Sequence, residues 1–208
     1  MIKALFLIFE PASSWDRVVA ARRGLGFILG FYLLPMLLIV AVAKGFGLVE
    51  WGKWRSFVGT MKVFTVNEAV IYETGQLLLM FLAVVVCAHL IKIMGETFHG
   101  RHSYTQAFTV VCYGLSPLFL LQLLDALPKI NPYLTWLIGV LFSVGILYQG
   151  IPRVMLPDPP HAFGLYMMGS LLIILATGFD CFVTTWYMSG RDPAIDNFIS
   201  QVAAKLPF

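Results

Sequence analysis

Five long apolar stretches, separated by polar connections, dominate the chain. They cover residues 24–43, 76–94, 105–124, 132–149 and 163–188. Each is close to the roughly 20 residues that a helix needs to cross the hydrocarbon core of a bilayer. None has the strict alternation of apolar and polar residues that a membrane barrel strand requires. Because backbone polar groups in lipid must be satisfied within the segment, the pattern predicts five transmembrane helices.

Composition agrees with a lipid environment. The chain has 208 residues, of which 59% are hydrophobic and 12% are charged, whereas soluble domains are about a quarter charged. The length suits a single domain over residues 1–208. With a net charge of +3 and no basic-aromatic patch, the chain is not expected to bind nucleic acid. The sequence therefore predicts an all-α, polytopic integral membrane protein in contact with lipid.

Proline and glycine positions predict where the helices bend and end. Pro35 and Pro117 lie inside the first and third stretches, where each removes a backbone donor and should bend its helix. Gly150 and Pro152 follow the fourth stretch and are expected to end that helix. The only long connection, residues 44–75, contains the capping-box pattern Thr65-x-x-Glu68, so the second helix should begin well before the membrane.

The stretch SSWDRVVAARR precedes the first span and predicts a short interfacial helix. Ser13 can cap this helix, with Asp16 at the capping-box position. Alternatively, the stretch is the start of the first span with snorkelling arginines. The residues expected at the lipid interface are Trp15, Arg17, Arg22, Arg23 and Arg153. Since basic residues before the first span favour the cytoplasmic side, we expect a multi-pass membrane protein with a cytoplasmic N-terminus.

Ionisable and amide side chains inside the spans are the candidate functional residues, because they are costly in lipid. His89 is expected near the cytoplasmic end of the second span, either hydrogen-bonded to a neighbouring helix or acting as a proton relay. Asp180 lies about eight residues, or roughly 12 Å, from the far end of the fifth span. It is interpreted as a paired or protonated structural carboxyl, or as an ion or proton site. Its expected neighbours are Gln76, Gln122 and Lys129.

A weaker pattern, Glu96-x-x-His99-x-x-His102, contains residue types that suit zinc. His161 could add to it, as in a metal-dependent membrane enzyme. Gly100 interrupts the helix that would align the trio, so a polar turn between two spans is the favoured interpretation. No G-x-S-x-G, H-E-x-x-H, phosphate-loop or dinucleotide pattern occurs, and the sequence predicts no catalytic residue and no cofactor.

Three segments resemble the Yip (Ypt/Rab-interacting protein) domain family in its bacterial form. They are FEPASSWDRV before the first span, GRHSYTQAFTVVCYGLSPLFLL with Tyr113 and Pro117, and LYQGIPRVMLPDPPHAFG before the fifth. They occur in the family's order and nearly span the chain. The resemblance implies a five-span, multi-pass protein of the bacterial inner membrane. In eukaryotic relatives it implies membrane trafficking, GTPase contact and bilayer shaping.

The expected function is therefore non-enzymatic. We expect a membrane-organising or accessory (scaffold) subunit that packs against lipids, other integral membrane proteins or further copies of itself. The alternative is a transporter or channel component, with a polar path near Asp180 and His89. A cavity that joins Asp180 to one surface would favour transport, whereas an Asp180 sealed against a neighbour would favour the accessory role.

Overall fold

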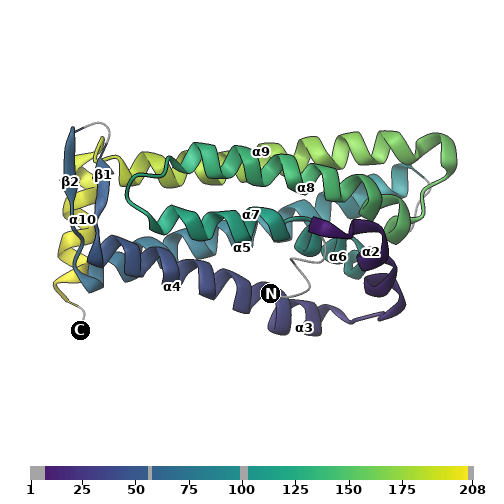
Figure 1. Cartoon of the computed structure of the whole chain (residues 1–208), viewed down its shortest axis with the longest axis horizontal. Helices are drawn as coiled ribbons and strands as arrows, with labels where there is room; N and C mark the ends of the chain where they lie inside the picture. The colour runs from purple at the N-terminus through teal and green to yellow at the C-terminus, as the bar shows by residue number, and fades with distance from the viewer. Residues whose placement is uncertain (1–7, 56–57, 99–102, 206–208) are drawn as a thin grey trace.

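The computed structural model describes residues 8–55, 58–98 and 103–205. Within these ranges five helical segments are long and apolar enough to cross a membrane: Leu25–Glu50, Val66–Thr97, Tyr104–Ala126, Pro132–Met155 and Pro159–Met188. They run alternately along the long axis of one elongated bundle (Figure 1). The predicted all-α, five-span fold is confirmed.

Three of the spans contain more than one helical element. The first consists of α3 (Leu25–Ile28), the π-helix η1 (Leu29–Leu33) and α4 (Leu34–Glu50). The second is α5 (Val66–Thr97). The third consists of α6 (Tyr104–Gly114), α7 (Ser116–Gln122) and the 3₁₀ turn η2 (Leu123–Ala126). The fourth is α8 (Pro132–Met155), and the fifth is η3 (Pro159–His161) followed by α9 (Ala162–Met188).

The helices extend beyond the apolar stretches that predicted them. Helix α4 continues to Glu50 rather than ending near residue 43, and α5 begins at Val66 rather than near residue 76. The capping box at the start of α5 is present: the Thr65 side chain accepts from the Glu68 amide, and the Glu68 carboxylate accepts from the Thr65 amide at 3.0 Å. The early start of α5, which the capping-box pattern predicted, is confirmed. The extension of α4 to Glu50 was not predicted, because hydropathy marks only the part of a helix that faces lipid.

The two intramembrane prolines lie where helical regularity changes. The π-helix η1 ends just before Pro35, and the third span breaks at Leu115, directly before α7 and Pro117. A proline lacks the amide hydrogen that an α-helix needs at that position, which accounts for an interruption at each site.

The expected end of the fourth span was wrong. Helix α8 passes through Gly150 and Pro152 and ends at Met155. Its end is made by Leu156, which adopts a left-handed conformation with φ of 44°. A proline costs one helical hydrogen bond, but here the remaining bonds and the packing of α8 carry the helix on for one more turn.

The N-terminal segment forms a separate helix, α2 (Pro11–Ala20), which packs against α8 (Figure 1). The predicted cap was wrong: the helix begins at Pro11, so Ser13 lies inside it, and its hydroxyl bonds to Glu10. Asp16 instead accepts a hydrogen bond from Arg153 Nε at 3.2 Å. This contact and the packing on α8 attach α2 to the bundle.

Trp15 does not face the acyl chains, contrary to expectation. Its side chain is completely buried, and its Nε1 donates to the Ile146 carbonyl at 3.1 Å. Its ring meets Tyr113 edge to face at 6.4 Å, and a Cβ added at Gly150 would overlap the indole. Sequence alone does not distinguish an apolar side chain that faces lipid from one that faces protein.

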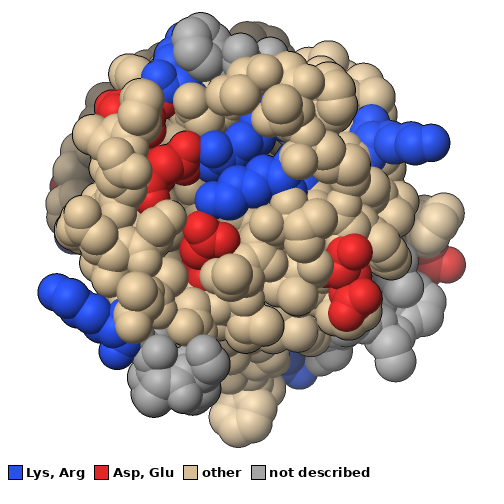
Figure 2. Space-filling view, turned by 90° about the vertical axis from the view of Figure 1, so that its left-hand side faces the viewer, with Lys and Arg blue, Asp and Glu red and all other residues tan. Residues whose placement is uncertain are grey.

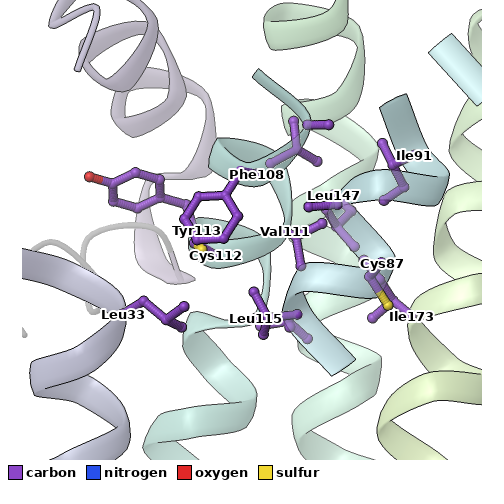
Figure 3. Packing of buried hydrophobic residues seen from close by; sticks show 14 of the residues in the cluster. Leu33, Cys87, Ile91, Phe108, Val111, Cys112, Tyr113, Leu115, Leu147 and Ile173 are labelled. Carbon is purple, nitrogen blue, oxygen red and sulfur yellow. The ribbon is translucent and has the colours of Figure 1, made fainter. Parts of the chain in front are cut away.

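The half of the bundle next to α2 is filled with apolar side chains. The third span lies at its centre, with 72% of its apolar window buried, compared with 28% for α5 and for the fifth span. Figure 3 shows Leu33, Cys87, Leu115, Leu147 and Ile173 meeting in this core. With lipid outside and protein inside equally apolar, close packing is the main force that holds these helices together.

The opposite end carries elements that the sequence did not predict. Strands β1 (Lys53–Arg55) and β2 (Thr60–Lys62) form an antiparallel hairpin, and α10 (Pro193–Ala203) lies beside it (Figure 1). Arg55 clamps the hairpin to α10 through two hydrogen bonds of 2.6 Å to the carboxylate of Asp196. Below, this end is called the hairpin end, and the other the α2 end.

Candidate functional site

A cavity of about 710 Å³ opens at the hairpin end of the bundle. Helices α4, α5, α8 and α9 and the segment from α7 to η2 form its wall, and the hairpin contributes Trp54 and Met61. Both of these residues and Tyr133 are exposed as well as lining the cavity, which places its mouth at this end. Figure 2 looks onto the hairpin end and shows basic and acidic side chains side by side near its centre. The cavity is thus polar at the surface where it opens.

Lys44 and Asp125 form a buried charged pair in the wall. Lys44 Nζ donates to Gln76 Oε1 at 2.5 Å and lies 3.9 Å from Asp125 Oδ2. The other oxygen of Asp125 accepts from the Thr135 hydroxyl at 2.5 Å. Lys44 and Asp125 are each less than a tenth exposed, so their charges compensate one another away from bulk water.

Lys53 lies at the base of the hairpin, outside the spans. Its Nζ donates to the backbone carbonyl of Asp125 at 2.8 Å. Burial lowers the pKa of the Lys53 ammonium, and the Asp125 carboxylate opposes that shift. The contact ties the hairpin to the end of the third span and closes one side of the cavity.

Asp180 and Glu73 have carboxylate oxygens without partners. Asp180 is 1% exposed, lines the cavity, and neither of its oxygens is hydrogen-bonded within the described part of the chain. Glu73 is 5% exposed, and its Oε1 is likewise unsatisfied there. Buried polar atoms are nearly always hydrogen-bonded. Two such carboxylates on one cavity therefore mark a place where a proton, water or ligand completes the structure.

The structure brings most of the predicted polar residues together. Gln76, Gln122 and Lys129 line the same cavity as Asp180. His89 does not: it lies on the exposed face of α5, towards the α2 end, so the structure does not combine it with Asp180 in one polar path.

Sequence reasoning missed Lys44, Glu73 and Asp125. Each lies just beyond an apolar stretch and was assigned to a connection or left out, although all three belong to helical segments. One signal was present: Glu73 and Gln76 are three residues apart, the spacing that places two side chains on one helical face.

The remaining candidates lie near the α2 end. Arg23 donates to the Tyr113 hydroxyl at 3.5 Å and lies over the ring of Phe27, while Arg17 and Arg22 are exposed. Glu96, from the weak metal pattern, pairs with Lys92 at 3.5 Å. His99 and His102 lie outside the described residues. Among the residues that are described, no three metal-ligating side chains come together.

Five membrane-length helices around a cavity open at one end define a multi-pass membrane protein with a candidate ligand pocket. The chain belongs to the Yip1 domain family, whose model matches residues 5–179. No curated protein and no solved structure gave a match. The family match includes Trp15, Tyr113 and Gly150, one from each segment that carried the resemblance, and these three meet where α2 docks on the bundle.

The close approach of α4 to η2 shapes one wall of the cavity and depends on Gly47. A Cβ at Gly47 would lie within 2.9 Å of the backbone of Ala126, next to Asp125. We expect Gly47→Ala to lower the free energy of unfolding by about 1–3 kcal/mol, because two backbones must separate. Gly45→Ala, where the added methyl meets only Glu73 Cγ at 3.5 Å, is the matched control. It should be neutral or stabilising by up to about 1 kcal/mol. Unfolding in mixed micelles measures both, and equal losses would contradict the expectation.

Proposed function

We propose that the protein is a non-enzymatic membrane protein of the membrane-organising or accessory type. In this proposal it holds a polar group of a membrane component in the cavity beside Asp180. The observation that supports this is a cavity that contains unsatisfied carboxylate oxygens, opens at the hairpin end and stops at the packed core of the bundle. Lipid or another integral membrane protein, including a second copy of the chain, would supply the group.

Because the cavity is closed at its inner end, it is better suited to binding a ligand than to transporting one. One to two turns beyond the polar residues, Val84, Leu118 and Ile173 are completely buried. They belong to the cluster of buried apolar residues that forms the core of the bundle (Figure 3). A conducting path needs polar groups or water along its whole length, and an apolar constriction stops conduction by excluding water.

Transport is the second candidate, and the cavity is the observation that favours it. The opening connects Asp180 with the hairpin end, as one half of an alternating-access site would. To complete the path, the packed core next to α2 would have to open. The two candidates thus differ in whether anything crosses the membrane.

The proposal includes an orientation. Arg17, Arg22 and Arg23 precede the first span, which supports a cytoplasmic N-terminus in a bacterial inner membrane. With five spans, the cavity would then open on the side opposite the cytoplasm. A cysteine introduced at Lys129, labelled by a membrane-impermeant reagent on intact cells, would test this side.

Reconstitution separates holding from transport. We expect vesicles with the wild-type protein to show no proton or alkali-cation flux above that of protein-free vesicles. Flux that is present in the wild type and lost in Asp180→Asn would overturn the proposal in favour of transport. In parallel, native mass spectrometry of protein purified in mild detergent should reveal a retained lipid or protein. If the wild type retains neither, the proposal is wrong.

A further inference from the structure

Within the described part of the chain, three carboxylate oxygens in the cavity wall lack a donor, although Lys44, Lys53 and Lys129 also line the cavity and Lys53 donates to the Asp125 carbonyl. Of the acids in its wall, Asp125 has Lys44 and Thr135 as partners. Asp180 has neither oxygen satisfied, and Glu73 has one oxygen unsatisfied. A carboxylate can only accept hydrogen bonds, so both residues require a donor. Lys44 is already engaged with Gln76 and Asp125.

We propose that the cavity binds an organic ammonium group, which donates to Asp180 and Glu73. This inference rests on the proposed function and names the chemistry of the group that the cavity holds. An ammonium ion carries three donors and one positive charge, which match the unsatisfied carboxylate oxygens of Asp180 and Glu73. An anion at this position would meet two carboxylates and be repelled.

The rest of the wall favours an organic cation over a bare metal ion. Apolar and aromatic side chains contribute most of it, including Leu48, Trp136 and Met188. A hard cation such as Ca²⁺ takes six to eight oxygen ligands around one point, and among the described residues no three metal-ligating side chains come together. Aromatic faces, in contrast, attract ammonium groups, and apolar walls accommodate the carbon atoms attached to them.

The volume fits a headgroup or a small amine rather than a single ion. About 710 Å³ lies within the range of pockets that enclose small organic molecules, roughly 300–1,000 Å³. The ammonium could come from the headgroup of a lipid at the membrane surface or from a dissolved amine. Both share the same contact with Asp180, so the experiment must separate these sources.

Lipid retention and amine titration test the inference on the full-length protein. The protein is placed in nanodiscs with equal amounts of phosphatidylethanolamine and phosphatidylglycerol, and native mass spectrometry then identifies the lipids that stay bound. Calorimetry with ethanolamine, against glycerol as the uncharged comparison, measures the dissolved source. We expect the protein to prefer phosphatidylethanolamine over phosphatidylglycerol, or ethanolamine over glycerol, in at least one of the two measurements. In Asp180→Asn, affinity should fall by about tenfold or more, because a charge-assisted hydrogen bond is lost.

Three further variants keep the test independent of folding. Glu73→Gln should weaken the same ligand, and Asp180→Glu should restore part of the affinity lost in Asp180→Asn. Glu50→Gln removes an exposed acid at the same end that does not line the cavity. It should leave binding unchanged.

The outcomes separate this inference from the proposed function. If ethanolamine and glycerol lipids are retained equally and no amine binds, the ammonium inference is overturned while the membrane-component proposal stands. Amine binding without lipid retention supports the inference and removes lipid as the source. Unchanged ammonium binding in Asp180→Asn overturns the inference, whichever ligand carries the group.

Discussion

Replacing Trp15 by alanine should lower the free energy of unfolding by about 3–5 kcal/mol, as for other fully buried large aromatic residues. The indole fills the space between α2 and α8, contacts Tyr113 and donates to the Ile146 carbonyl. Its removal leaves a cavity and also removes the indole hydrogen bond to the Ile146 carbonyl. Denaturation by sodium dodecyl sulfate in mixed micelles, followed by circular dichroism, measures the loss.

Two control variants test whether the loss in stability comes from the burial of Trp15 rather than from the removal of any tryptophan. Trp186 is 45% exposed, and Trp186→Ala should cost less than about 1 kcal/mol, as expected for a surface position. Trp15→Phe keeps most of the ring packing and loses the Nε1 donor. Its loss in free energy of unfolding should lie between those of Trp15→Ala and Trp186→Ala. Equal losses for Trp15→Ala and Trp186→Ala would contradict the docking of α2 described here.

Replacing Arg55 by methionine should release α10 from the bundle. Arg55 holds Asp196 through two parallel hydrogen bonds, and Tyr72 donates to the same carboxylate at 3.1 Å. Removing one partner of a largely buried ion pair costs about 3–5 kcal/mol; the side chains of this pair are 8% and 22% exposed. We expect faster hydrogen exchange in α10 and cleavage near residues 189–192, while the spans stay protected.

A less buried ion pair at the same end provides the control. Lys62 pairs with Glu68 at 2.9 Å with 30% of its side chain exposed. Lys62→Met should therefore change exchange in α10 little and cost about 1 kcal/mol or less. If Arg55→Met left the exchange of α10 unaltered, the clamp would not hold this helix.

The clamp should also give α10 a pH dependence. Hydrogen bonds from Arg55 lower the pKa of Asp196 below its ordinary value of 3.8, and the pKa of Arg55 is raised by the same contact. The stabilisation is complete above the unfolded-state pKa of Asp196 and is lost as the pH falls through its lower folded-state value. The protection factors of the α10 amides, which are corrected for the intrinsic pH dependence of exchange, should thus stay constant from neutral pH down to about pH 5 and fall below about pH 4. Asp196→Asn should remove this transition.

Hydropathy located all five spans because lipid allows few exceptions to an apolar surface. Hydropathy gave no information where the chain does not face lipid. Lys44 and Glu73 lie within helices but face the cavity. As charged residues they fall just outside the apolar stretches 24–43 and 76–94. The three-residue strands of the hairpin are too short to show a clear alternation. Helix α10 has local start signals, Asp192 as its N-cap and Pro193 at its first position, but it was not predicted from them. Its contact between Arg55 and Asp196 is not visible in the sequence.

The candidate site was predictable only in part. Asp180 stood out because an acid among apolar residues is rare, and counting helical turns placed Gln76, Gln122 and Lys129 at its level. The pairing of Lys44 with Asp125 depends on how three spans approach one another, which the sequence of each span does not contain. Trp15 was misplaced for a similar reason, because its burial depends on the space that Gly150 leaves on α8, far away in the sequence.

The uneven filling of the bundle also shapes the electric field across it. Inside an open cavity the electric potential stays close to that of the adjoining solution. The membrane voltage therefore falls mainly across the packed half next to α2. A full crossing of the membrane is worth about 2.3 kcal/mol per charge for each 100 mV. A cation beside Asp180 would sense only part of this. Its occupancy would follow the composition of the solution at the hairpin end more than the energised state of the cell.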